Sequence, residues 1–103
     1  MGNDNLARKI TSLTPRCKEQ LDEAMTYIAA DSPKQAEIMA EQFSAVRKIM
    51  EIMPEIGSKY KNGMRRFLLG KFPYYIYYRE KETEIEILGI WHTSRGTDFE
   101  DEA

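Results

Sequence analysis

The residues best suited to chemistry are basic side chains interleaved with aromatic ones between Lys59 and Arg79. This segment holds six Lys and Arg residues, no acid, and the run FPYYIYY at residues 72–78. The whole chain has 15 basic and 17 acidic residues, so removing these six leaves 9 against 17, a balance of −8. Positive charge gathered beside aromatic rings in an otherwise acidic protein indicates a surface that binds an anionic partner.

Proton transfer near neutral pH has one candidate, His92, the only histidine of the chain. It follows an apolar segment. A histidine in that place is equally typical of a structural role, in which the ring hydrogen-bonds a backbone carbonyl. The single cysteine, Cys17, can form neither an internal disulfide nor a zinc site, and we expect it to be a small buried hydrophobe. We therefore expect neither a metal nor a cofactor.

Length and composition predict a single domain over residues 1–103. Hydrophobic residues make up 42% of the chain and charged residues 31%, which is typical of a globular protein. We expect residues 96–103 to form a mobile acidic tail. No apolar run approaches the ~20 residues of a membrane-spanning helix. The N-terminus also has no secretory pattern, so we expect a cytoplasmic protein that does not bind membranes.

Two amphipathic helices are predicted in the first half of the chain. Thr14-Pro15 has the pattern of a helix start, and apolar residues at spacings of three and four continue to about Ala30. Ser32-Pro33 starts a second helix, which must stop before Pro54 because the residue preceding a proline avoids the helical region. With a connection of two or three residues, the two helices must form a hairpin.

The second half predicts strands, because the apolar period changes to two. They are expected at residues 64–69, 74–79 and 84–91, and residues 7–13 add one more before the first helix. The order β-α-α-β-β-β predicts an α+β fold, with the helical hairpin packed on a twisted, mainly antiparallel sheet. The aromatic strand places Tyr74, Ile76 and Tyr78 on one face and Tyr75, Tyr77 and Arg79 on the other. One set is expected in the core and the other at the surface.

These elements and three short patterns resemble the RelE/ParE superfamily of bacterial toxins over roughly residues 10–95. The patterns are PEIG at residues 54–57, the aromatic rhythm from Gly70 to Tyr77, and His92 with Arg95 after the last strand. The resemblance implies the toxin of a type II toxin–antitoxin module, which inhibits growth and is neutralised in a complex with its antitoxin. RelE-like members cleave messenger RNA in the ribosomal A site, whereas ParE-like members lack that chemistry and inhibit DNA gyrase.

The two targets imply different roles for the same residues. If the chain is a metal-independent ribonuclease, the catalytic residues that the resemblance implies are His92, Arg95, Arg65 and Arg66. The residues expected to bind a target or phosphate are Lys59, Lys61, Lys71, Tyr75, Tyr77 and Arg79.

Three observations favour gyrase as the target. Tyr75 stands where the ribonucleases carry an arginine, the strand at 64–69 has no lysine pair, and a pI near 5.5 suits a phosphate-rich ribosomal site poorly. A ribosome-dependent ribonuclease is the alternative, and an inactive binding module of the same fold is the third possibility.

Overall fold

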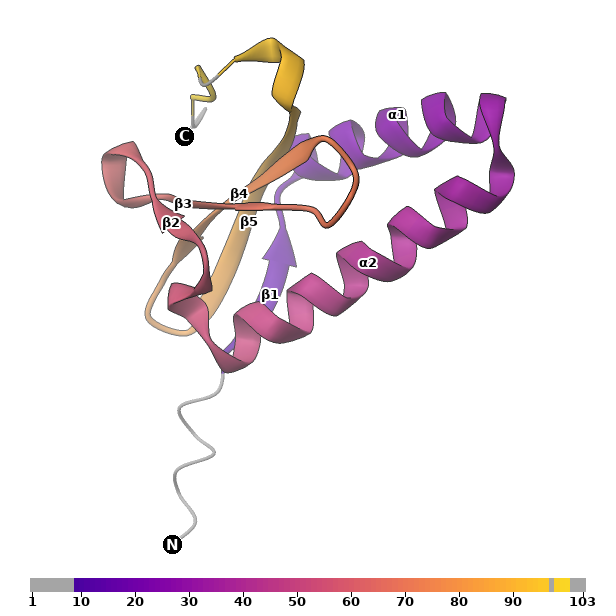
Figure 1. Cartoon of the computed structure of the whole chain (residues 1–103). Helices are drawn as coiled ribbons and strands as arrows, with labels where there is room; N and C mark the ends of the chain where they lie inside the picture. The colour runs from indigo at the N-terminus through magenta and orange to yellow at the C-terminus, as the bar shows by residue number, and fades with distance from the viewer. Residues whose placement is uncertain (1–8, 97, 101–103) are drawn as a thin grey trace, which may run out of the picture.

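The fold is two helices packed on one face of a five-stranded sheet (Figure 1). The computed structural model describes residues 9–96 and 98–100. Its helices and strands are β1 (Ile10–Leu13), α1 (Pro15–Asp31), α2 (Pro33–Ile52), β2 (Ser58–Lys59), β3 (Arg65–Leu68), β4 (Tyr74–Glu80) and β5 (Glu84–His92). Three short 3₁₀ turns are η2 (Pro54–Ile56), η3 (Lys61–Gly63) and η4 (Thr93–Arg95). The predicted α+β fold is confirmed.

Side-chain caps define the helical hairpin. The Thr14 hydroxyl accepts a hydrogen bond from the Cys17 N–H at 3.0 Å, and this cap starts α1. Ser32 ends α1 by donating its backbone N–H to the Ile28 carbonyl, and its hydroxyl starts α2 by accepting from Gln35. One residue therefore links the helices, where two or three were expected. Within residues 9–96 and 98–100, no helix is long and apolar enough to cross a membrane.

The sheet has the strand order β1-β5-β4-β3-β2. β1 runs parallel to β5, and the other neighbours are antiparallel, which agrees with the predicted mainly antiparallel sheet. The first strand was expected from residue 7 and begins at Ile10, although residues 7 and 8 lie outside the described residues. The two-residue strand β2 was not predicted, because its Ser and Lys have no apolar alternation.

A β-bulge in β5 changes which residues face the helices. Tyr77 lies opposite Gly89 and Tyr78 lies opposite Ile87, so Leu88 is an extra residue between them. Before the bulge Ile87 packs against the helices, and after it Ile90 does so, three positions later. Leu88 points to the opposite side of the sheet, which we call the outer face.

The core therefore has two parts. The larger part lies between the sheet and the helices and includes Cys17, whose thiol pKa burial raises to about 12. The smaller part lies on the outer face, and we call it the outer cluster: its buried members are Met64, Tyr77, Leu88 and Phe99. Phe99 was expected in a mobile tail, but its side chain is fully buried. Its ring fills a space on the outer face, which the tail expectation did not include.

Candidate functional site

Arg65 and Arg66 point to opposite faces of β3, as their adjacency on a strand predicts. Arg65 lies on the helix side, where its Nη1 donates to the Gly57 carbonyl at 2.8 Å and to the Glu55 carbonyl at 3.4 Å. Both carbonyls belong to the segment that leads from α2 into the sheet. Arg65 therefore fixes this connection, and its guanidinium is engaged with backbone.

Arg66 lies on the outer face among tyrosines. Its Cζ is 4.4 Å from the ring centroid of Tyr75 and 5.4 Å from that of Tyr60, which are cation–π distances. Its Nη1 donates to the Tyr77 hydroxyl at 3.4 Å, and this hydrogen bond is the main cause that raises the pKa of Arg66. The pair of Arg66 and Tyr75 thus presents charge and an aromatic ring together.

Tyr77 was predicted to contact a target, and in this structure other rings of the same chain cover it. It lies on the same face as Tyr75, as the alternation predicts, and this is the outer face, but its side chain has no exposed surface. Phe99 stacks on it at 4.3 Å and Tyr60 packs edge-on at 4.9 Å. Burial also raises the pKa of the Tyr77 hydroxyl. Tyr77 is therefore a buried member of the outer cluster.

His92 lies at the end of β5, on the helix side of the sheet. Its ring packs perpendicular to Tyr74 at 5.0 Å, and its Nδ1 accepts a hydrogen bond from the Ser94 backbone N–H at 3.0 Å. This bond caps η4, so the histidine has a backbone partner, but a donor in place of the expected carbonyl.

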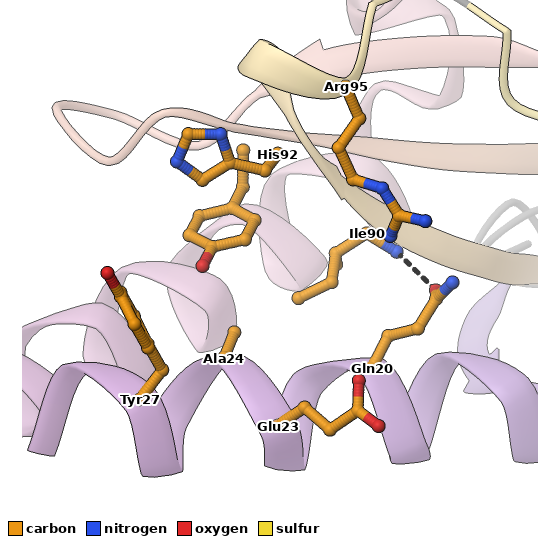
Figure 2. A pocket seen from close by; sticks show the side chains of 8 residues that line it. Gln20, Glu23, Ala24, Tyr27, Ile90, His92 and Arg95 are labelled. Carbon is orange, nitrogen blue, oxygen red and sulfur yellow. Dashed lines mark hydrogen bonds between the residues drawn. The ribbon is translucent and has the colours of Figure 1, made fainter. Parts of the chain in front are cut away.

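A polar cavity of about 170 Å³ lies between α1 and this end of the sheet (Figure 2). It is lined by Gln20, Glu23, Ala24, Tyr27, Tyr74, Ile90, His92 and Arg95. The Gln20 side-chain oxygen accepts from the Ile90 N–H at 3.0 Å, which joins α1 to β5. Arg95 borders the cavity and also places its Cζ 4.0 Å from the Trp91 ring centroid, at the outer face.

The residues implied for ribonuclease chemistry do not form one site. Arg65 lies opposite Tyr78 on β4, whereas His92 lies opposite Tyr74. Four residues along a strand separate these positions by about 13 Å. Arg66 is on the other face of the sheet. No three side chains of His, Cys, Asp or Glu gather to hold a metal ion within the part of the chain that the structure describes.

The other basic residues of the predicted site lie in different places. Lys59 lies on β2 and is exposed, Lys61 pairs with Glu100, and Arg79 donates to the Asn62 carbonyl at 3.0 Å. Lys59 lies opposite Arg65, so it shares the helix side with that residue, whereas Arg66 lies on the outer face. The other three lie near the turn between β2 and β3, and we call them the basic hairpin: Lys61, Arg66 and Arg79. Lys71 is exposed at the other end of β3 and apart from this group.

Sequence reasoning missed the residues that complete the outer face. Arg16 comes from the first turn of α1, with its Cζ 4.6 Å from the ring centroid of Phe99 and 5.9 Å from that of Trp91. Phe99 was included in the acidic tail and its ring was not considered. The available signal was an aromatic residue standing alone among acids, which is unusual for a solvated segment.

Comparisons with known proteins agree with the fold and identify the family. The family described as "ParE toxin of type II toxin-antitoxin system, parDE" matches residues 12–96. A solved structure titled "Chromosomal ParDE TA system from P. aeruginosa" matches with a TM-score of 0.71 and 21% sequence identity. The match covers 84% of this chain and 97% of that chain. A search of curated proteins gives no match. With the family match over most of its length, the chain belongs to the ParE toxins of type II toxin–antitoxin systems.

Proposed function

We propose that this toxin inhibits DNA gyrase in the cytoplasm and that a cognate antitoxin neutralises it. The observation that carries the proposal is the separation of Arg65, Arg66 and His92. Cleavage of RNA needs a proton-transfer group and charge stabilisers within hydrogen-bond reach of one phosphate, about 2.6–3.2 Å. Side chains on opposite faces and about 13 Å apart along the sheet do not meet that requirement.

A toxin that does not cleave RNA must act by binding, and the charge of this chain favours a protein target. The net charge is −2, so the molecule as a whole gains little from the counterion release that drives binding to nucleic acid. Its positive charge is local, and Arg and Tyr are the residues that protein–protein contacts favour. We therefore assign the gyrase contact to the basic hairpin together with Tyr75. Lys59 and Lys71 lie outside this surface.

The target is tested by inducing the toxin without antitoxin and by assaying the purified protein. We expect inhibition of gyrase supercoiling, with intact messenger RNA on translating ribosomes. Arg66→Ala should weaken the inhibition at least about tenfold if this guanidinium is a contact hot spot. Lys71→Ala removes a positive charge from the same segment but outside the proposed surface, and it should inhibit as the unsubstituted chain does.

Two results would replace this proposal with another function. Codon-phased cuts in messenger RNA that disappear in His92→Ala, with supercoiling unaffected, would show a ribosome-dependent ribonuclease. Absence of both effects would favour an inactive binding module of the same fold.

The antitoxin is expected from a gene directly adjacent to this one. Ile52 and Met53 at the end of α2 are 63% and 50% exposed, and apolar side chains of this size at a surface suit a bound segment. Co-expression with each flanking gene should yield a small protein that co-purifies with the toxin as a hetero-oligomer and restores growth. If neither neighbour binds, this part of the proposal fails, whatever the target is.

A further inference from the structure

The outer face of the sheet contains a slot that holds one aromatic ring. Phe99 fills it: the ring stacks on Tyr77 at 4.3 Å and 6°, and meets Trp91 edge-on at 5.4 Å and 82°. Arg16 lies over the same ring at 4.6 Å. The floor of the slot is Gly89, where a Cβ would come within 2.7 Å of the Phe99 ring. A Cβ there would also come within 2.6 Å of the Gln20 side-chain oxygen, so the glycine makes room for both this oxygen and the ring.

Polar groups at the rim of the slot bind the backbone and the acidic neighbour of that ring. The Tyr60 hydroxyl donates to the Phe99 carbonyl at 3.2 Å, and Arg16 Nη1 donates to the Glu100 carbonyl. The Lys61 ammonium pairs with the Glu100 carboxylate. The slot thus recognises three features in a row: an aromatic ring, peptide carbonyls and a carboxylate.

The segment that fills the slot has the properties of an exchangeable occupant. Residues 98–100 form neither helix nor strand, and they lie beyond residues 12–96, which the family matches. When residues 98–100 occupy the slot, one hydrogen-bond donor lacks an acceptor. The Trp91 Nε1–H is buried and has no acceptor among residues 9–96 and 98–100. A different peptide with an acceptor at this point would gain a hydrogen bond that residues 98–100 do not make.

We propose that this slot is a docking site for an acidic peptide segment with an aromatic residue, presented by a partner protein. The toxin's own residues 98–100 occupy the site in cis and compete with that peptide. Because they are tethered beside the slot, their effective concentration is of the order of millimolar, so only a well-matched peptide displaces them. A single ring slot between donors to peptide carbonyls favours a peptide over a nucleic acid, which needs successive stacking platforms. The proposal does not depend on whether gyrase is the target.

The test uses the full chain and a labelled synthetic peptide, TDFEDEA, with the sequence of residues 97–103. Binding is measured by peptide anisotropy and by the fluorescence of Trp91, the only tryptophan. The full chain with Phe99→Ala has an empty slot, and it should bind the peptide at least about tenfold more tightly than the unsubstituted chain. The same peptide with alanine in place of phenylalanine should bind neither protein.

A second variant protects the test against a folding defect in Phe99→Ala. Glu100→Lys breaks the pair with Lys61 at a side chain that is 66% exposed, so the fold is not at risk. It should raise peptide affinity severalfold. The matched control is Glu37→Lys, which makes the same charge change in an exposed pair with Lys34 on α2 and should leave the affinity unchanged.

Three outcomes would overturn the proposal. One is a folded Phe99→Ala chain, or a Glu100→Lys chain, that binds the peptide no more tightly than the unsubstituted protein. Another is Phe99→Ala binding a single-stranded heptanucleotide but not the peptide, which would assign the slot to nucleic acid. A third is dimerisation of the unsubstituted chain that is lost in Phe99→Ala, which would assign the slot to the Phe99 of a second copy.

Discussion

The Tyr78 hydroxyl fastens the chain where it passes from the helices into the sheet. It is buried, donates to the Pro54 carbonyl at 2.8 Å and accepts from the Gly57 N–H at 2.8 Å. A Cβ at Gly57 would lie 2.7 Å from this oxygen, so the close approach requires glycine there. The PEIG segment is thus fitted to one tyrosine on β4.

Removal of this hydroxyl should destabilise the fold. Tyr78→Phe leaves a buried N–H and a carbonyl without their partner, and we expect the free energy of unfolding to fall by about 1–3 kcal/mol. Urea denaturation measures the change. Tyr27→Phe, at a residue that is 78% exposed, is the control and should stay within about 0.5 kcal/mol of the unsubstituted chain. Equal stability of both variants would show that the Tyr78 bonds contribute nothing.

Buried tyrosines also predict how stability depends on pH. Burial raises the pKa of Tyr74, Tyr77 and Tyr78 above the ordinary 10.0, so the folded state favours the protonated phenols. Their contribution is complete below the unfolded pKa and is lost as the pH rises from that value through the folded pKa. The free energy of unfolding should therefore fall above about pH 10. The fall should be shallower in Tyr78→Phe, and an unchanged slope would contradict this explanation.

For single residues, the sequence predicted the direction in which a side chain points better than it predicted how exposed that side chain is. Strand alternation correctly placed Arg65 and Arg66 on opposite faces and Tyr77 on the same face as Tyr75, although it did not say which face the helices cover. It failed on the exposure of Tyr77, because the ring that covers it belongs to Phe99, 22 positions later in the chain. Such a contact leaves no trace in local periodicity.

The helices were predictable as elements because their signals are local. Caps, a proline in each first turn and apolar stripes lie within the segments themselves, and both hairpin helices are confirmed. The edge strand β2 and the bulge at Leu88 were not predictable. Each is set by the strand beside it: β2 exists because β3 offers hydrogen-bonding groups at Arg65 and Arg66.

The N-cap side chains of the two helices should contribute differently to stability because they make different numbers of hydrogen bonds. Thr14 Oγ1 accepts from the Cys17 N–H and also donates to the Leu88 carbonyl at 3.1 Å, at the bulge of β5. Ser32 Oγ accepts from the Gln35 N–H alone among the side-chain bonds of the described residues. Thr14→Ala should cost about 2 kcal/mol and Ser32→Ala about 1 kcal/mol, as measured by chemical denaturation. A reversed order would mean that the bond to the bulge is not stabilising.

Charge is unevenly distributed over the whole molecule. The segment from Lys59 to Arg79 carries six positive charges, and the remainder has a balance of −8. A contact made by the basic hairpin is therefore screened by salt, because exposed charges lose most of their interaction beyond a Debye length of about 10 Å at 0.1 M. This makes the ionic strength a probe of the proposed gyrase contact.

Association with gyrase should slow markedly as salt increases. Between about 0.05 M and 0.5 M salt we expect the association rate constant to drop by at least about tenfold, with a smaller effect on dissociation. Surface-based kinetics with immobilised gyrase can measure both rates. Arg79→Ala should flatten the dependence and Lys71→Ala should not. A rate that does not respond to salt would place the contact away from the basic hairpin.

The parallel pairing of β1 with β5 also determines when the sheet can be completed during translation. Ile10 pairs with Glu84 and Leu13 with Ile87, a separation of 74 positions in each case (84 − 10 and 87 − 13). At a synthesis rate of about 5–20 residues per second, β1 waits roughly 4–15 s for its partner strand to be translated. The sheet therefore stays incomplete throughout this interval. A toxin built this way cannot complete its fold before β5, at Glu84–His92, has been translated.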